Sequence, residues 1–391
     1  MRKELLDFLE RCEPEQFKLL EGLVLQPSFS RYKEGVDAVG RLITDSLQGT
    51  GMSLETVSEN ELGDHLIFRS PGFRAGGQSV LLVGHMDTVF PVDSGFNFYR
   101  ENGNKVHGPG VIDMKGGLVV TIFAIKALAA RGLLKSLPLT FICNSDEEIG
   151  SPSSAQLIRA EAGKAAFGLG FECGGMGGEV VTGRKGKMGY KLSIQGRAGH
   201  AAFAGPEKMS AILELAHKVI ALEQLNDPER KIVVNVGVVT GGVGPNSIAE
   251  SAMALIDTRF LEQSDAIETD LKIAQIVAEQ VVAGTQGVLQ PTSSRLPMEQ
   301  TDANKKLFRL IRQQSEVLGI ACREELRSGV SDANTMAEAG IPVVDGLGPI
   351  GDCDHSDREY MVRDSLLART KLAALTILGG WESFRNPVDA G

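Results

Sequence analysis

The chain has 391 residues, more than one ordinary hydrophobic core accommodates, and this length predicts two domains. A hydrophobic content of 42% and a charged content of 23% are those of a globular protein and argue against disorder. The formal net charge of −10 argues against a nucleic-acid-binding protein. The sequence contains no run of about 18 apolar residues, so no membrane span is expected.

Helices and strands are expected to alternate along the first half of the chain. Apolar residues at helical spacing predict amphipathic helices, and short apolar runs predict buried strands. The predicted helices cover 3–25 (as one helix or two), 35–47 and 116–131, and the predicted strands cover 79–83, 137–143 and 167–171. This alternation indicates an α/β sheet.

A second pattern begins at about Gly183, where alternating strands and periodic helices form two strand–helix–strand units. The predicted strands cover 187–195, 231–240 and 252–260, and the predicted helices cover 209–225 and 264–283. A helix over 302–318 and a short strand over 343–346 then resume the first domain. We therefore assign 1–182 and 296–391 to the main domain, and 183–295 to a domain inserted into it.

The cysteines indicate the cellular compartment. They are scattered, odd in number and without Cys-x-x-Cys spacing, at Cys12, Cys143, Cys173, Cys322 and Cys353. This usage fits free thiols in a reducing compartment. The charged segment 1–12 lacks the apolar core of a secretion signal, so we expect a cytoplasmic protein.

Histidine and carboxylate residues follow the predicted strands of the first domain. His85 and Asp87 follow the first strand, Glu147 and Glu148 the second, and Glu172 the third. In open α/β sheets, ligands bind beyond the carboxyl ends of the strands. Any one of these loops could be an ordinary polar turn, but three together favour a site.

Each residue also has an ordinary structural interpretation. Asp113, in a Gly-rich segment before a helix, could be a helix cap. His85 and Asp87 could be a surface pair, and Glu147 and Glu148 an exposed acidic turn. The functional interpretation is a metal-bound histidine oriented by a carboxylate, with one glutamate as a ligand and the other as a base.

His355, which follows the last predicted strand, brings the set to two histidines and several carboxylates. Mixed nitrogen and oxygen ligands suit zinc, cobalt or manganese. A carboxylate can bridge two metals, and such a pair polarises a carbonyl and lowers the pKa of water. A nearby carboxylate that binds no metal can accept the proton and return it to a leaving amine.

Three motifs resemble the di-zinc metallopeptidase family that includes carboxypeptidase G, aminoacylase and succinyl-diaminopimelate desuccinylase. In order they are 84–91 (GHMDTVFP), 108–117 (GPGVIDMKGG) and 145–151 (SDEEIGS), and the resemblance covers essentially the whole chain. It implies a three-layer α/β/α zinc-peptidase catalytic domain. It also implies that the inserted domain is an α+β, ferredoxin-like lid and dimerisation domain.

The resemblance implies a role for each residue of the site. The implied ligands of two zinc ions are His85 with Glu172, Glu148 with His355, and Asp113 as the bridge, with cobalt or manganese as possible substitutes. Asp87 would orient His85, and Glu147 would be the general base. The peptide bond between Asp113 and Met114 is expected to be cis.

The inserted domain carries three further residues that the resemblance singles out. His200 would reach the active site of the partner subunit in a homodimer and stabilise the oxyanion there. Asn246 and Arg259 would bind the substrate carboxylate. From the residues alone, His200 is an ordinary loop histidine and Arg259 a salt-bridge partner of Asp257.

The segments 184–186 (RKG) and 346–351 (GLGPIG) resemble most closely the carboxypeptidase G group, which removes C-terminal glutamate. We therefore expect a carboxypeptidase for small peptide or N-acyl-amino-acid substrates, with glutamate favoured and a zinc-activated bridging water deprotonated by Glu147. The alternative is an N-acyl-amino-acid deacylase or desuccinylase with the same di-zinc site. A non-catalytic metal-binding relative is disfavoured because only catalysis needs Glu147.

Overall fold

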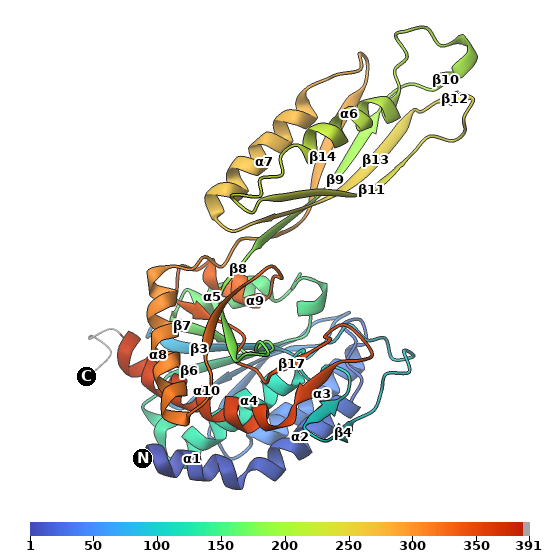
Figure 1. Cartoon of the computed structure of the whole chain (residues 1–391). Helices are drawn as coiled ribbons and strands as arrows, with labels where there is room; N and C mark the ends of the chain where they lie inside the picture. The colour runs from blue at the N-terminus through green and yellow to red at the C-terminus, as the bar shows by residue number, and fades with distance from the viewer. Residues whose placement is uncertain (386–391) are drawn as a thin grey trace. The chain divides into compact units, whose positions relative to one another are not determined.

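The computed structural model describes residues 1–385 and divides into two compact units (Figure 1). The first unit comprises 1–183, 300–326 and the chain from Ser331 onward, and the second comprises 184–299 and 327–330. The second unit is therefore an insertion in the first. Compared with the sequence-based boundaries of 183–295, the second unit begins one residue later and also contains 296–299 and the short returning segment 327–330.

A six-stranded mixed sheet lies at the centre of the first unit, in the order β1-β2-β6-β3-β7-β16. Its strands are β1 (Ser53–Val57), β2 (His65–Arg69), β3 (Ser79–His85), β6 (Leu139–Asn144), β7 (Ala165–Gly170) and β16 (Val343–Val344). The strands β6, β3, β7 and β16 pair in parallel, whereas β1 and β2 are antiparallel additions. The parallel strands therefore end at one edge of the sheet.

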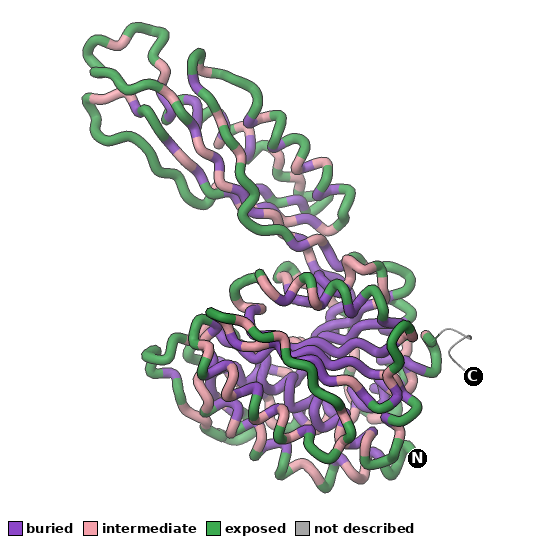
Figure 2. The backbone as a smooth tube through the Cα atoms, turned by 180° about the vertical axis from the view of Figure 1, so that it is seen from behind, coloured by how far each residue is buried: buried purple, intermediate pink, exposed green. Residues whose placement is uncertain are grey.

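Helices cover both faces of this sheet, which gives the expected three-layer α/β/α architecture (Figures 1 and 2). One layer consists of α1 (Arg2–Arg11), α2 (Glu13–Leu25), α3 (Lys33–Leu47), α4 (Lys115–Ala130), α8 (Asp302–Leu318) and α10 (Arg363–Phe384). The other contains α5 (Ala155–Ala162) and α9 (Asp332–Ala337), which contact β7.

The residues of β3 show why helices must pack against both faces of the six-stranded sheet. Val80 and Leu82 belong to the large hydrophobic core with α4 and α10, whereas Leu81 and Val83 alternate with them and are equally buried. A strand that is apolar on both sides is typical of a parallel sheet between two helical layers. None of the helices within 1–385 combines the length and apolar character needed to cross a bilayer.

Two smaller sheets complete the first unit. A four-stranded sheet has the order β17-β18-β5-β4, and β8 pairs with β15. These strands are β4 (Arg100–Asn102), β5 (Lys105–His107), β8 (Glu179–Arg184), β15 (Arg323–Arg327), β17 (Gly351–Asp352) and β18 (Tyr360–Val362). The four-stranded sheet matters for the site because the loop 353–359 joins β17 to β18.

The second unit is a four-stranded antiparallel sheet, β11-β13-β9-β14, with two helices. In chain order it contains β9 (Gly186–Gln195), α6 (Ala211–Glu223), β11 (Val233–Gly241), β13 (Ser251–Phe260), α7 (Gln263–Ala278) and β14 (Gln286–Arg295). This βαββαβ order gives the expected ferredoxin-like topology. The short strands β10 (Gly199–His200) and β12 (Ser247–Ile248) form a separate pair.

Candidate metal centre

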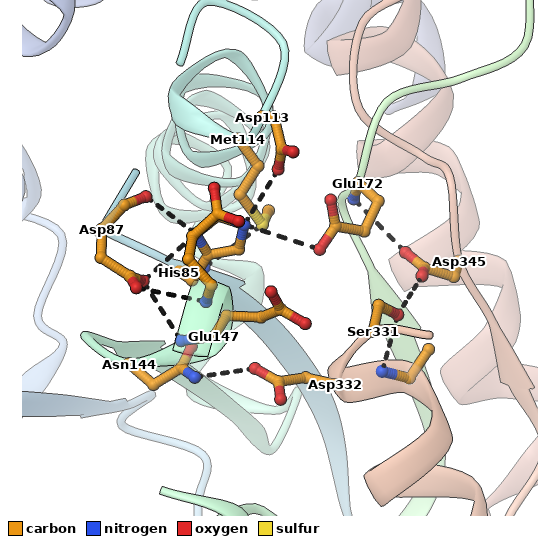
Figure 3. A network of polar contacts seen from close by, with 12 residues as sticks. His85, Asp87, Asp113, Met114, Asn144, Glu147, Glu172, Ser331, Asp332 and Asp345 are labelled. Carbon is orange, nitrogen blue, oxygen red and sulfur yellow. Dashed lines mark hydrogen bonds and ion pairs between the residues drawn. The ribbon is translucent and has the colours of Figure 1, made fainter. Parts of the chain in front are cut away.

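The candidate site lies at the carboxyl ends of three neighbouring parallel strands, β6, β3 and β7, and Figure 3 shows many of its side chains from close by. His85 is the last residue of β3 and pairs in register with Asn144, the last residue of β6. Glu147 begins a short 3-10 turn just beyond β6, and Glu172 lies two residues beyond the end of β7. The sheet therefore brings together the polar residues that the sequence placed after separate strands.

Asp113 lies between the two histidines of the site. It precedes α4, and its peptide bond to Met114 is cis, as expected from the resemblance. His85 Nε2 is 3.1 Å from Asp113 Oδ1, and His355 Nε2 is 3.0 Å from Asp113 Oδ2. The two oxygens of one carboxylate thus face two different imidazoles.

Each histidine also contacts a different glutamate. His85 Nε2 is 3.7 Å from Glu172 Oε1, and His355 Nε2 is 3.2 Å from Glu148 Oε2. Each half of the site therefore has one imidazole, one glutamate and one oxygen of Asp113. Asp354 lies beside the second half, because one of its carboxylate oxygens is within 4.8 Å of ligand atoms of Asp113 and His355.

The electrostatics of these residues reflect crowded negative charge. Burial, together with the nearby charge of Asp113, raises the pKa of Glu148 to about 8. The same two causes raise the pKa of Glu172 well above its ordinary value. Hydrogen bonds with Asp113 and Glu148 raise the pKa of His355 to about 11. The carboxylates of Asp113 and Glu148 therefore stabilise positive charge next to them, at the position of His355.

The donor set fits divalent metal ions. Glu148 has a side chain only 5% exposed, and its Oε1 is buried with no hydrogen-bond partner in the described part of the chain. A buried carboxylate oxygen without a partner is costly, and a cation is one way of satisfying it. Together with two imidazoles and further carboxylates, this arrangement has the ligand chemistry of zinc, and also suits cobalt or manganese.

Asp87 connects His85, a candidate metal ligand, to the loop of the candidate base. It is fully buried, and its backbone oxygen is 3.0 Å from His85 Nδ1. Its carboxylate accepts hydrogen bonds from the backbone N–H groups of Glu147 (3.3 Å) and Glu148 (3.2 Å), and from Ser30 Oγ (2.7 Å). Asp87 therefore holds the imidazole and this loop in one arrangement, as Figure 3 shows for His85 and Glu147.

Sequence reasoning missed Asp345, which supports Glu172. It is fully buried; its Oδ1 accepts a hydrogen bond from Glu172 N (3.3 Å), and its Oδ2 accepts one from Ser331 Oγ (2.7 Å). The sequence contained a signal for Asp345, because it directly follows the apolar pair Val343-Val344 of a short strand. The same pattern had identified the other strand ends.

Sequence reasoning also missed Asp332, which holds the loop of Glu147 and Glu148 at both ends. Asn144 Nδ2 donates to one of its oxygens at 2.7 Å, and Ser151 Oγ donates to the other at 2.5 Å. These donors precede and follow the loop in the chain. Nothing in the spacing of the sequence indicates this contact, because Asp332 is 188 residues from Asn144.

In the second unit, His200 lies close to Asn246. His200 is exposed, pairs with Ser247 between β10 and β12, and accepts a hydrogen bond from Ala202 N at Nδ1 (3.2 Å). The adjacent Ala201 N donates to the backbone oxygen of Asn246 at 2.9 Å. The structure therefore brings these two predicted residues together.

Arg259 lies apart from that pair. It is near the end of β13, opposite Val233 of β11, and its Nε donates to Asp257 Oδ2 at 2.9 Å. This is the salt bridge that the residues alone suggested. Ser251 begins β13 just after β12, so Arg259 is eight residues further along, or roughly 26 Å at the usual rise of an extended strand.

Comparisons with known proteins agree with this geometry. The family model described as "Peptidase family M20/M25/M40" matches residues 81–379. Carboxypeptidase G2 from Pseudomonas sp. (strain RS-16) is 30% identical over 373 residues, covering 94% of this chain and 89% of that protein. Succinyl-diaminopimelate desuccinylase from Wolinella succinogenes is 24% identical over 386 residues, covering 93% of this chain and all of that enzyme.

A solved structure supports the fold. The crystal structure of an M20 family metallo-carboxypeptidase, Sso-CP2 from Sulfolobus solfataricus, matches with a TM-score of 0.71 at 16% sequence identity. The match covers 93% of this chain and 98% of that chain. The architecture of both units is therefore shared over nearly the full length.

Proposed function

The chain belongs to peptidase family M20/M25/M40 and is a metal-dependent hydrolase, and from this we propose that it is a two-zinc carboxypeptidase. The observation that carries the proposal is the arrangement around Asp113. Its two oxygens face two separate His–Glu pairs, His85 with Glu172 and His355 with Glu148. Each pair, with one oxygen of Asp113, would hold one zinc ion.

The proposed mechanism assigns the proton transfers to Glu147. When bound, the two ions would polarise the scissile carbonyl and lower the pKa of water. Glu147 belongs to neither His–Glu pair, and its backbone N–H is held by Asp87. Its carboxylate would accept the proton of the attacking water and return it to the nitrogen of the leaving amine.

We propose that C-terminal glutamate is the preferred leaving group. Support comes from the likeness to carboxypeptidase G2, which is greater than the likeness to the desuccinylase. The alternative is deacylation of N-acyl amino acids at the same site, which the similarity to a desuccinylase and to an acetylornithine deacetylase keeps open.

A steady-state panel separates the two activities. We expect the zinc-loaded enzyme to show its highest kcat/KM on dipeptides and acyl conjugates that end in glutamate, with the same acyl groups on leucine as controls. A preference of more than about tenfold, or 1.4 kcal/mol, for N-acetyl amino acids over glutamate-terminated peptides would contradict the glutamate assignment.

We further propose that the enzyme is a homodimer formed through the second unit. The edge strand β11 exposes Val238 and Val239, and α6 exposes Ile220. An unpaired strand edge with apolar side chains favours pairing with another chain. Moreover, Asn246 lies in the loop between β11 and β12, whereas Arg259 pairs with Val233 at the far end of β11. We propose that they bind one substrate carboxylate only when they come from different subunits.

Mixing two inactive variants tests this arrangement. His200→Ala is expected to lower kcat by about 10²- to 10³-fold as the loss of an oxyanion donor, and Glu147→Gln removes the base. If His200 acts in the partner subunit, a mixed dimer has one intact site. Statistical mixing should then restore about a quarter of the wild-type activity. A light-scattering mass of one chain, or mixing without restored activity, would contradict the proposal.

We propose the cytoplasm as the site of action. The support is the scattered, odd set of five cysteines, which is typical of a reducing compartment. The substrates we propose are small peptides or acyl amino acids rather than nucleic acids, consistent with a net charge of −10.

A further inference from the structure

Glu359 is a buried carboxylate with no part in the two His–Glu pairs. Its side chain has no solvent exposure, and both of its oxygens accept hydrogen bonds from backbone N–H groups. Gly110 donates to Oε2 at 2.8 Å, while Ile112 and Asp113 donate to Oε1 at 2.8 and 3.2 Å. All three donors belong to the loop that ends at the bridging Asp113.

The chain segment of Glu359 also carries the metal-binding His355. Both residues lie between β17 and β18, and Glu359 N donates to Ser356 O at 3.1 Å, which closes the segment into a turn. His355 has a φ of 57°, in the left-handed region that few residues other than glycine adopt. Surrounding contacts must therefore hold this turn in place.

The two loops leave adjacent strands of one small sheet. Tyr360 of β18 pairs in register with His107 of β5, so the residue after Glu359 lies opposite the residue before Gly108. The buried carboxylate of Glu359 links the same two loops through its hydrogen bonds to Gly110, Ile112 and Asp113. Because an isolated buried carboxylate is strongly disfavoured, its bonds to three N–H groups hold the two loops together firmly.

We propose that Glu359 is a positioning residue that fixes Asp113 and His355 relative to each other, so that both can bind the same metal ion. The inference rests on the proposed metal-binding roles of those two residues. Glu359 need not touch substrate or metal. It acts by binding the backbone of the loop that carries Asp113, while it is itself part of the loop that carries His355.

The substitution Glu359→Gln tests the inference because it changes hydrogen-bonding capacity and little else. A glutamine offers one acceptor oxygen, and its NH₂ group would face a backbone N–H instead of accepting from it. Supporting contacts of this kind typically contribute 10- to 100-fold in metal affinity. We expect zinc affinity, measured by competition with a chromophoric chelator, to fall by about that factor.

A second readout and a matched control distinguish positioning from general stability. The visible spectrum of the cobalt-loaded enzyme should shift in E359Q, because the ligand geometry changes. The control is Glu214→Gln in the second unit, since Glu214 is also buried and accepts backbone N–H groups, from Val281 and Val282. E214Q should keep the wild-type spectrum and a zinc affinity within about twofold of wild type.

The outcome that overturns the inference is an E359Q enzyme that melts cooperatively yet binds zinc as tightly as wild type, with an unchanged cobalt spectrum. If E359Q does not fold, Glu359→Asp replaces it: the carboxylate is kept but is one methylene too short to reach all three donors. Unchanged zinc affinity in E359D would then overturn the inference. Failure of the proposed function would look different, because the wild type itself would not bind two zinc ions.

Discussion

Replacing Glu147 by Gln is expected to lower kcat by about 10²- to 10⁴-fold while both zinc ions stay bound. The amide keeps the shape of the side chain but cannot accept the proton of the attacking water. Glu147 is outside both His–Glu pairs, and Asp87 holds it through its backbone N–H, which the substitution leaves in place. Steady-state kinetics and metal analysis on the same sample measure the two effects together.

The matched control for this substitution is Glu61→Gln, at an exposed carboxylate. It removes the same charge and is expected to leave kcat and zinc content at wild-type values. A Glu147→Gln enzyme with wild-type kcat would show that another group accepts the proton. Loss of zinc in Glu147→Gln would instead make Glu147 a ligand.

Replacing Asp113 by Asn is expected to reduce zinc from two ions to one or fewer per chain, and to lower kcat at least as much as Glu147→Gln. In the structure each oxygen of Asp113 contacts a different histidine, His85 or His355. An asparagine offers only one oxygen, and its NH₂ group would face the second ion. A substitution at any other proposed ligand is expected to affect one zinc ion, whereas Asp113→Asn is expected to affect both.

Elemental analysis after dialysis against zinc-free buffer measures the stoichiometry. Asp354→Asn is the control, because the Asp354 carboxylate lies in the same cluster but is exposed and belongs to neither His–Glu pair. We expect D354N to retain two zinc ions. An Asp113→Asn enzyme that also retained two would contradict the bridging role.

The positions of the site residues could be predicted from the sequence because local patterns encode them. Buried strands of a parallel sheet are apolar along their whole length, so the first polar residue after each run marks a strand end. His85 and Glu172 were located in this way. The pairing of ligands and the role of Asp113 came from the resemblance, since taken alone Asp113 is better explained as a helix cap.

Several elements were not predicted, and two of them, α10 and β14, were missed for different physical reasons. The helix α10 has buried residues around its circumference, so its sequence lacks the amphipathic period of a surface helix. The strand β14 contains Pro291, which argues against a strand. It is tolerated because β14 lies at the edge of its sheet and the register shifts between Pro291 and Ser293.

Two of the supporting carboxylates, Asp332 and Glu359, could not be predicted, because their partners are distant in the chain. Asp332 binds Asn144 across 188 residues, and Glu359 binds Gly110 across 249. No periodicity or spacing encodes such contacts, and only the folded chain shows that both acids hold the loops of the candidate metal ligands.

The most direct test of the two-metal site is an anomalous difference map from crystals of the zinc-loaded enzyme, collected at the zinc absorption edge. We predict two peaks, each about 2.0–2.2 Å from a different oxygen of Asp113. One should lie within reach of His85 and Glu172, and the other within reach of His355 and Glu148. A single peak, or two peaks that do not share Asp113, would contradict the account.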